Sequence, residues 1–236
     1  RLQEHLEDRQ RQKEFTERVG QLSGKASWEQ AVKAGAGKTF AEVPAHARIT
    51  PYEQVVRSAR GEQGGTSAEA DRLARELHTE LQKMVPPETL RKIPPVNIVY
   101  EDRHADRGHS LQEAERYDPN TQTIYARKGT SLNTLVHEWG HHAEDTSQLW
   151  PLNQAWIKER SGGTTVPLSK TDSGYHASEL AYADKFTHPY VGKIYSRGSE
   201  VLSMGMQQLK ESPALFKRKD PEHYALTVAL LGGEFL

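Results

Sequence analysis

The chain contains no cysteine among its 236 residues. Disulfide bonds and thiolate metal ligands are therefore excluded, and any metal site must use histidine and carboxylate side chains. An excess of one charge is also missing, because 31 lysines and arginines accompany 32 aspartates and glutamates. A chain this close to neutral has no strong field toward nucleic acid or anionic lipid, so we expect neither nucleic acid nor a membrane as a partner.

Long apolar stretches are absent as well. No run approaches the roughly 18 residues that a membrane-spanning helix needs. Residues 1–15 are densely charged and have none of the apolar centre of a secretory signal. Hydrophobic residues still make up 35% of the chain, which suits one moderate core with an extension. The chain does not begin with methionine, and we expect an upstream domain in a longer polypeptide.

The first 65 residues differ in character from the rest. Residues 1–22 predict a charged helix, and the stretch up to residue 65 is rich in glycine, alanine and serine. Gly-Lys-Thr at 37–39 matches the end of a phosphate-binding loop, but Val32 stands where that loop requires glycine. We therefore expect an N-terminal helical or linker region over 1–65 and a separate domain over 66–236.

Periodicity and turn residues predict an α+β, mostly helical fold with a small sheet for the second region. Helices are predicted from Thr66 or Ser67 to Pro86 and over 152–160, 176–185, 199–210 and 221–233. Strands are predicted over 96–102 and 121–127, the latter in a hairpin spanning 114–129, and 161–174 is predicted as a loop.

A helix with two histidines follows the hairpin. Thr130 or Ser131 is a suitable N-cap, and apolar residues after it form a core-facing stripe. His137 and His141 are four residues apart, so their side chains project from one helix face and can reach a single tetrahedral ion. Glu138 is offset by about 100° around the helix, where a general base for a metal-activated water belongs.

Catalytic zinc usually takes three protein ligands and one water. The metzincin extension is excluded, because Glu144 and Ser147 stand where it requires glycine and histidine. We expect the third ligand to be Glu200, which opens a half-buried helix and needs a partner there. Glu179 and His176 remain alternatives.

Four further residues are candidates for roles around the ion. His142 is predicted to lie outside the ligand set, and Asp145 to contact the His141 imidazole without reaching the metal. Tyr190 and Tyr195 precede Glu200, and either hydroxyl could stabilise an oxyanion or simply pack as an aromatic residue.

Three stretches carry a family resemblance: "HEWGHHAE", "YADKFTHPYVGKIYSRGSEVLSMGMQQL" and "DPEHYALTVALLGG". They resemble the C-terminal region of tailed-phage and prophage minor head (head-morphogenesis) proteins, which look like zincin metallopeptidase domains of the Glu-ligand type. The resemblance covers about residues 95–236. It implies zinc held by His137, His141 and Glu200, Glu138 as catalytic base, a cytoplasmic or virion-associated location, and a capsid or host protein as substrate.

Three functions are compatible with these observations. The first is a zinc endopeptidase that binds a peptide in a cleft lined by strand 121–127. The second is a non-enzymatic head component stapled by zinc, which needs a fourth protein ligand such as His142 or His176. The third is a delivered toxin that uses the same peptidase chemistry.

Overall fold

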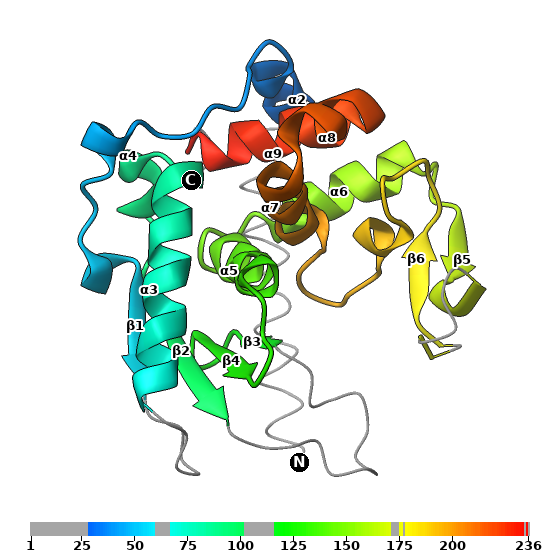
Figure 1. Cartoon of the computed structure of the whole chain (residues 1–236). Coiled ribbons are helices and arrows are strands. Elements are labelled where there is room, and N and C mark those ends of the chain that lie inside the picture. The colour runs from blue at the N-terminus through cyan, green and yellow to red at the C-terminus, as the bar shows by residue number, and fades with distance from the viewer. Residues whose placement is uncertain are drawn as a thin grey trace, which may run out of the picture.

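The computed structural model describes residues 28–59, 67–101, 116–170, 175–176, 178–233 and 235. The fold is α+β and predominantly helical, with α5 between α3 and α7 (Figure 1). The helices are α2 (Trp28–Ala36), α3 (Ser67–Met84), α4 (Pro87–Leu90), α5 (Leu132–Thr146), α6 (Trp150–Arg160), α7 (Val201–Glu211), α8 (Pro213–Lys219) and α9 (Pro221–Leu231). The strands are β1 (Val56–Ala59), β2 (Val96–Glu101), β3 (Arg116–Asp118), β4 (Thr123–Arg127), β5 (Thr165–Pro167) and β6 (Leu180–Tyr182). Short 3-10 helices cover Ala45–Ala47, Tyr52–Gln54, Leu168–Lys170 and Pro189–Gly192. The helix predicted over 1–22 lies outside the described residues.

The larger sheet confirms the predicted hairpin and changes its role. Among the described strands the order is β1-β2-β4-β3, with β1, β2 and β4 parallel and β3 antiparallel to β4. Tyr117 of β3 pairs with Ile124 of β4. Strand β4 is thus paired on both sides, and β3 is the edge strand of this sheet. The prediction that 121–127 lines a peptide-binding cleft is wrong, because an inner strand has no free edge to offer.

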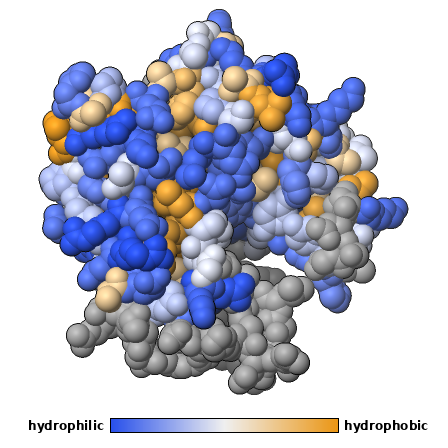
Figure 2. Space-filling model, in the orientation of Figure 1, coloured by the Kyte–Doolittle hydropathy of each residue, from blue (hydrophilic) through white to orange (hydrophobic). Residues whose placement is uncertain are grey.

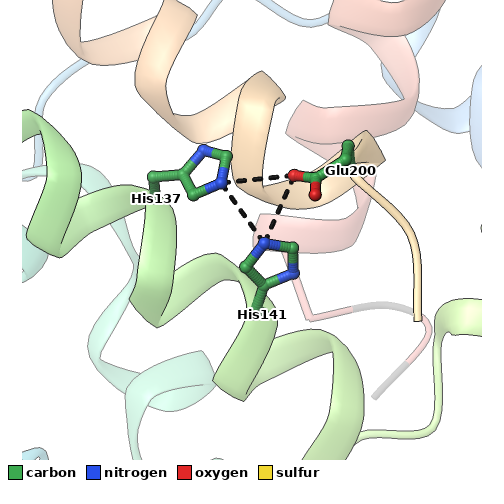
Figure 3. A group of neighbouring side chains, drawn as sticks. All are labelled: His137, His141 and Glu200. Atoms are coloured by element: carbon green, nitrogen blue, oxygen red, sulfur yellow. Dashed lines mark hydrogen bonds and ion pairs between the residues drawn. The ribbon is translucent and has the colours of Figure 1, made fainter. Parts of the chain in front are cut away.

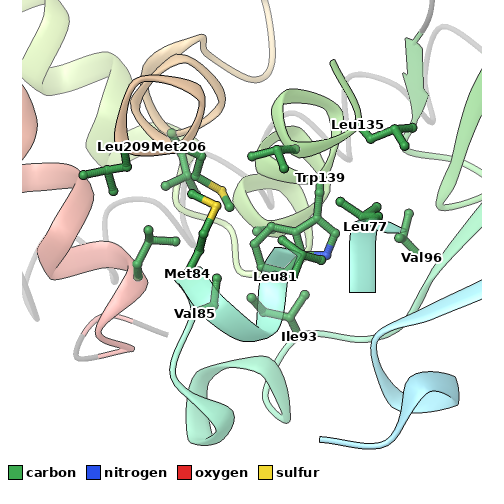
Figure 4. Close-up of a cluster of buried hydrophobic side chains, with 14 of the residues drawn as sticks. Leu77, Leu81, Met84, Val85, Ile93, Val96, Leu135, Trp139, Met206 and Leu209 are labelled. Carbon is green, nitrogen blue, oxygen red and sulfur yellow. The ribbon is translucent and has the colours of Figure 1, made fainter. Parts of the chain in front are cut away.

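The core forms where α3 and α5 cover one another and the sheet. Leu73, Leu77 and Leu81 recur at helical spacing along α3, and each is at most 2% exposed. Figure 4 shows Leu77 and Leu81 close to Trp139, which α5 contributes and which is 1% exposed. Burial of each such leucine contributes about 2 kcal/mol. This packing fixes one face of α5 and leaves the opposite face for polar residues.

Two glycines permit unusually close helix crossings on the other side of α5. A Cβ on Gly140 of α5 would lie 2.5 Å from the Cα of Ser203 in α7. A Cβ on Gly205 of α7 would lie 2.2 Å from Oγ1 of Thr227 in α9. The backbones of α5 and α7 are therefore in direct contact at Gly140, and the Thr227 side chain of α9 packs directly on the α7 backbone at Gly205.

Elements on both sides of residue 65 pack together. Strand β1 pairs in parallel with β2, beginning with Val56 opposite Val96. Helix α2 lies against α9 so closely that a Cβ on Gly35 would meet the carbonyl oxygen of Ala225 at 1.8 Å. The described part of the first 65 residues is therefore continuous with the core of the remainder.

The prediction of a helix over 176–185 is wrong. Strand β6 lies there and pairs in an antiparallel fashion with β5, and β5 lies in the stretch that was predicted as a loop. Leu180 also accepts a hydrogen bond at its carbonyl from the Ile194 backbone N–H, at 2.9 Å. Because β6 pairs on both sides, these long-range hydrogen bonds outweigh the local helical preference of the sequence.

Helices α3, α5, α6, α7 and α9 agree with their predictions within a few residues, whereas α4, α8 and β1 were not predicted. None of the helices in the described ranges has the length and apolarity to cross a bilayer. On the face in Figure 2, hydrophilic residues dominate and hydrophobic residues gather in small patches.

Candidate metal centre

Helix α5 begins as the sequence predicts. Ser131 is its N-cap, and its hydroxyl accepts a hydrogen bond from the Thr134 backbone N–H at 3.1 Å. Leu135 and Val136 are fully buried against the core. This packing sets the rotation of the helix, so the histidine face that begins one residue later turns toward α7.

The structure brings His137, His141 and Glu200 together (Figure 3). The two histidine Nε2 atoms are 3.2 Å apart, and each lies 3.2 Å from Oε2 of Glu200. Both histidines come from α5, whereas Glu200 is the N-cap residue of α7. Three ligand atoms therefore converge on one point, and the cluster could hold a metal ion.

Glu200 is completely buried, and its carboxylate accepts hydrogen bonds from two side chains. Ser203 Oγ donates to Oε2 at 2.9 Å, and the Tyr195 hydroxyl donates to Oε1. Burial by itself would raise the pKa of Glu200, but His141 and His137 hold it well below its ordinary value. Glu200 is therefore a carboxylate, the form in which it can bind a cation.

The interaction with Glu200 also changes the pKa of His141. Burial would lower its pKa, but the Glu200 carboxylate raises it to about 9. Protonated His141 thus offsets the buried negative charge of Glu200. A cation at this position would take over that role.

Glu138 lies beside the cluster and is 8% exposed. Its Oε2 accepts a hydrogen bond from the Tyr117 backbone N–H at 2.8 Å. Burial raises the pKa of Glu138, although His141 and His137 act in the opposite direction. A carboxylate with a raised pKa is better suited to take up and return a proton near neutral pH.

The cluster opens on a cleft of about 390 Å³. Edge strand β3 and the turn after it line this cleft through Arg116, Tyr117 and Pro119. Tyr190 and Tyr195 line it as well. His137, His141, Glu200 and Glu138 thus line a surface that a ligand can reach.

The two tyrosines differ in their contacts. The Tyr195 hydroxyl donates its one proton to Glu200 Oε1. The Tyr190 hydroxyl lies 3.3 Å from that of Tyr195. Because the Tyr195 proton is already committed, Tyr190 is the donor in this second hydrogen bond.

His142 lies outside the cluster, as predicted. It is fully buried, with Nε2 2.7 Å from the carbonyl oxygen of Pro94 and Nδ1 3.1 Å from the Tyr117 hydroxyl. Asp145 does not contact His141 as the sequence suggested. It forms an ion pair with Arg197 at 2.7 Å instead.

Glu179 and His176, the alternative ligands, are also outside the cluster. Glu179 forms an ion pair with Lys193 at 2.8 Å and accepts a hydrogen bond from the His176 backbone N–H. The His176 ring is bonded to Ser178. The ligand atoms that converge within the described residues belong to Glu200 and the two histidines of α5.

Sequence reasoning missed a network around Glu144, which is 2% exposed. Ser199 donates to it through its backbone N–H, at 2.8 Å, and through its hydroxyl. Asn153 of α6 donates its amide to Oε1. Burial raises the pKa of Glu144 to about 7, while the bonds from Ser199 and Asn153 oppose the rise. Since Ser199 directly precedes Glu200, this network joins the third candidate ligand to α5.

Comparison with known proteins gives no match: neither a family model, nor a curated protein, nor a solved structure is similar to this chain. The resemblance to phage minor head proteins stays a prediction.

Proposed function

We propose that this protein is a zinc-dependent peptidase in which His137, His141 and Glu200 bind the ion and Glu138 is the general base. The observation that carries the proposal is the arrangement of the cluster itself. Three ligand atoms lie at mutual distances of 3.2 Å, and a buried carboxylate stands beside them at the wall of an open cleft.

The dimensions of the cluster fit zinc. Zinc binds histidine nitrogen and carboxylate oxygen at about 2.0–2.1 Å, so two ligands of a tetrahedral ion lie about 3.3 Å apart. The observed 3.2 Å agrees without any movement of the backbone. Two histidines with one glutamate are also a known ligand set of catalytic zinc.

When bound, zinc supplies a Lewis acid for the scissile carbonyl and lowers the pKa of a coordinated water to roughly 7. Glu138 accepts the proton of the attacking water and transfers it to the leaving amine. Because Oε2 already accepts the Tyr117 N–H, we assign the proton transfer to Oε1, the oxygen with more free acceptor capacity. Tyr190 can turn its hydroxyl from Tyr195 toward the carbonyl oxygen as negative charge develops there.

A purely structural zinc site is less well supported. Such a site is closed by a fourth protein ligand. Both candidates for that position are hydrogen-bonded to other groups, His142 to Pro94 and His176 to Ser178. Within the described residues, just three ligand groups converge. A three-ligand set leaves a position open, as catalytic sites require.

The proposed substrate is an extended peptide. β3 is the edge strand in the described sheet and lines the cleft, so a peptide could lie along it, although the outward N–H of Tyr117 is already bonded to Glu138. The same site could cleave a capsid protein, or a host protein if the chain is a toxin. Only the resemblance to phage proteins supports these two substrates.

The test compares wild type with Glu138→Gln. Both proteins are loaded with zinc and incubated with dye-labelled casein. The sequence around the first bond cleaved in casein is then made as a fluorescence-quenched peptide and used for kinetics. We expect about one zinc per chain in both, with hydrolysis at least 100-fold slower in the variant, because general-base catalysis contributes about 10²–10⁴-fold. Equal hydrolysis by the two proteins would exclude Glu138 as the base.

A further inference from the structure

Tyr117, at the middle of edge strand β3, connects two buried groups of α5. Its backbone N–H donates to Glu138 Oε2 at 2.8 Å. Its hydroxyl lies 3.1 Å from Nδ1 of His142, and the two rings meet edge to face at 5.3 Å. One residue thus contacts the proposed general base through its backbone and the neighbouring histidine through its side chain.

The contacts of His142 determine which atom donates. The carbonyl oxygen of Pro94, 2.7 Å from Nε2, can only accept, so Nε2 carries the hydrogen. A neutral imidazole has one donor and one acceptor nitrogen, so Nδ1, which faces the Tyr117 hydroxyl at 3.1 Å, is the acceptor of this ring. The Tyr117 hydroxyl therefore donates to Nδ1. Asp145 lies farther from that hydroxyl, at 3.4 Å, and would need the same single proton.

The direction of the Tyr117 N–H follows from the sheet. In an antiparallel pair, alternate residues point their N–H groups toward the partner strand and away from it. The N–H of Tyr117 is directed at Glu138, so it makes no bond to β4. Among the described residues, this is the hydrogen bond that orients the Glu138 carboxylate.

We propose that Tyr117 and His142 are positioning residues, which together fix the direction of the Glu138 carboxylate. His142, held by Pro94, fixes the Tyr117 ring against α5. The ring fixes β3, and β3 presents its N–H to Oε2 of Glu138, a residue that lines the cleft. This inference rests on the proposed function, because it assigns a purpose to the orientation of the base.

Orientation matters because a general base must lie within hydrogen-bond reach of the proton that it takes. The Glu138 side chain has three rotatable bonds, and a charge-assisted hydrogen bond from a backbone N–H restrains the carboxylate at their end. Loss of that restraint should remove part of the contribution of the base. We expect about a tenfold decrease in kcat, with KM unchanged.

The decisive comparison is Tyr117→Pro with Tyr117→Ala. Both variants lose the ring, but only proline loses the N–H. Proline is tolerated at an edge strand where the N–H makes no ladder bond. With zinc-loaded protein and the quenched casein peptide, Tyr117→Pro should have a kcat about tenfold below that of Tyr117→Ala, at equal KM and zinc content. Equal kcat values in the two variants would overturn the proposed role of the N–H.

Tyr117→Phe tests the side chain with minimal risk to folding. It removes only the hydroxyl and should lower kcat about threefold, and His142→Asn should retain more activity than His142→Leu because the amide oxygen can replace Nδ1 as acceptor. An unchanged kcat in Tyr117→Phe, or equal activity in both His142 variants, would exclude His142 from this role.

A measurement without turnover separates this inference from the proposed function. In protein labelled with 15N-tyrosine, the Tyr117 amide is the peak absent from Tyr117→Phe. We expect it at low field, as for an N–H bonded to a carboxylate, and we expect an upfield shift in Glu138→Ala. If the peak does not move, the contact is refuted whether or not casein is cleaved. If the peak moves but wild type and Glu138→Gln cleave equally, the proposed function fails and the contact remains.

Discussion

Replacing Gly140 by alanine should disturb the metal centre more than it disturbs the fold. Gly140 lies between His137 and His141 on α5, at the crossing with α7. An added Cβ would lie 2.5 Å from the Cα and 2.9 Å from the backbone N of Ser203. Carbon atoms pack at about 3.5–4.0 Å, so α7 must move by about 1 Å to admit the methyl group.

The effect on stability is the sum of two opposing contributions. Overpacking of a close crossing costs about 1–3 kcal/mol. Alanine is favoured over glycine within a helix by about 1 kcal/mol, which offsets part of that cost. The free energy of unfolding of Gly140→Ala should therefore fall by roughly 0–2 kcal/mol.

The effect on the metal follows from the position of Glu200, three residues before Ser203 at the start of α7. A zinc ligand is expected within about 0.2 Å of its ideal distance, so a shift of about 1 Å is large. We expect the zinc dissociation constant to rise at least tenfold, measured by competition with a chelator. Gly37→Ala is the matched control, because a Cβ at Gly37 meets nothing within 4 Å. An unchanged zinc affinity in Gly140→Ala would refute this account of how the two helices position the ligands.

Two further predictions address other buried groups. Tyr195→Phe removes the donor to Glu200 Oε1 and should weaken zinc binding about tenfold. Tyr190→Phe should leave the zinc affinity unchanged. Equal zinc affinities of the two variants in chelator competition would contradict this prediction. Burial lowers the pKa of His223 to about 4, from about 6.5 in the unfolded chain, although Asp220 acts in the opposite direction. Its neutral form therefore stabilises the fold fully above pH 6.5, and about 3 kcal/mol of that stability is lost as the pH falls to 4. Urea unfolding at pH 7 and pH 4.5 should show a smaller acid loss for His223→Gln, which keeps a donor for the Val201 carbonyl, and an equal loss would exclude His223 as a source of acid sensitivity.

The sequence was most informative where a pattern acts within one element. His137 and His141 are four residues apart in a helix with a clear N-cap, so their common face follows from helix geometry alone. Glu200 could be proposed because a carboxylate at the start of a half-buried helix requires a partner. The structure places its Oε2 within 3.2 Å of both histidines, but the identity of the metal remains a prediction.

Contacts between distant elements were not predictable in this way. Tyr117 meets Glu138 because an edge strand packs on α5, and Ser199 meets Glu144 across 55 residues. No periodicity marks either pair, since neither residue type nor spacing specifies which surface of a neighbouring element it will face. β6 was misassigned for the same reason, because its hydrogen-bond partners lie in β5 and beside Ile194.

Zinc titration of metal-free protein by calorimetry tests the central claim most directly, with Glu179→Ala as the matched control for Glu200→Ala. Glu179 is a partly exposed carboxylate paired with Lys193, outside the cluster. We predict about one zinc per chain for wild type and Glu179→Ala, and binding at least 100-fold weaker for Glu200→Ala. Unweakened binding in Glu200→Ala, or absence of zinc binding in wild type, would contradict the assignment of His137, His141 and Glu200 as the ligands.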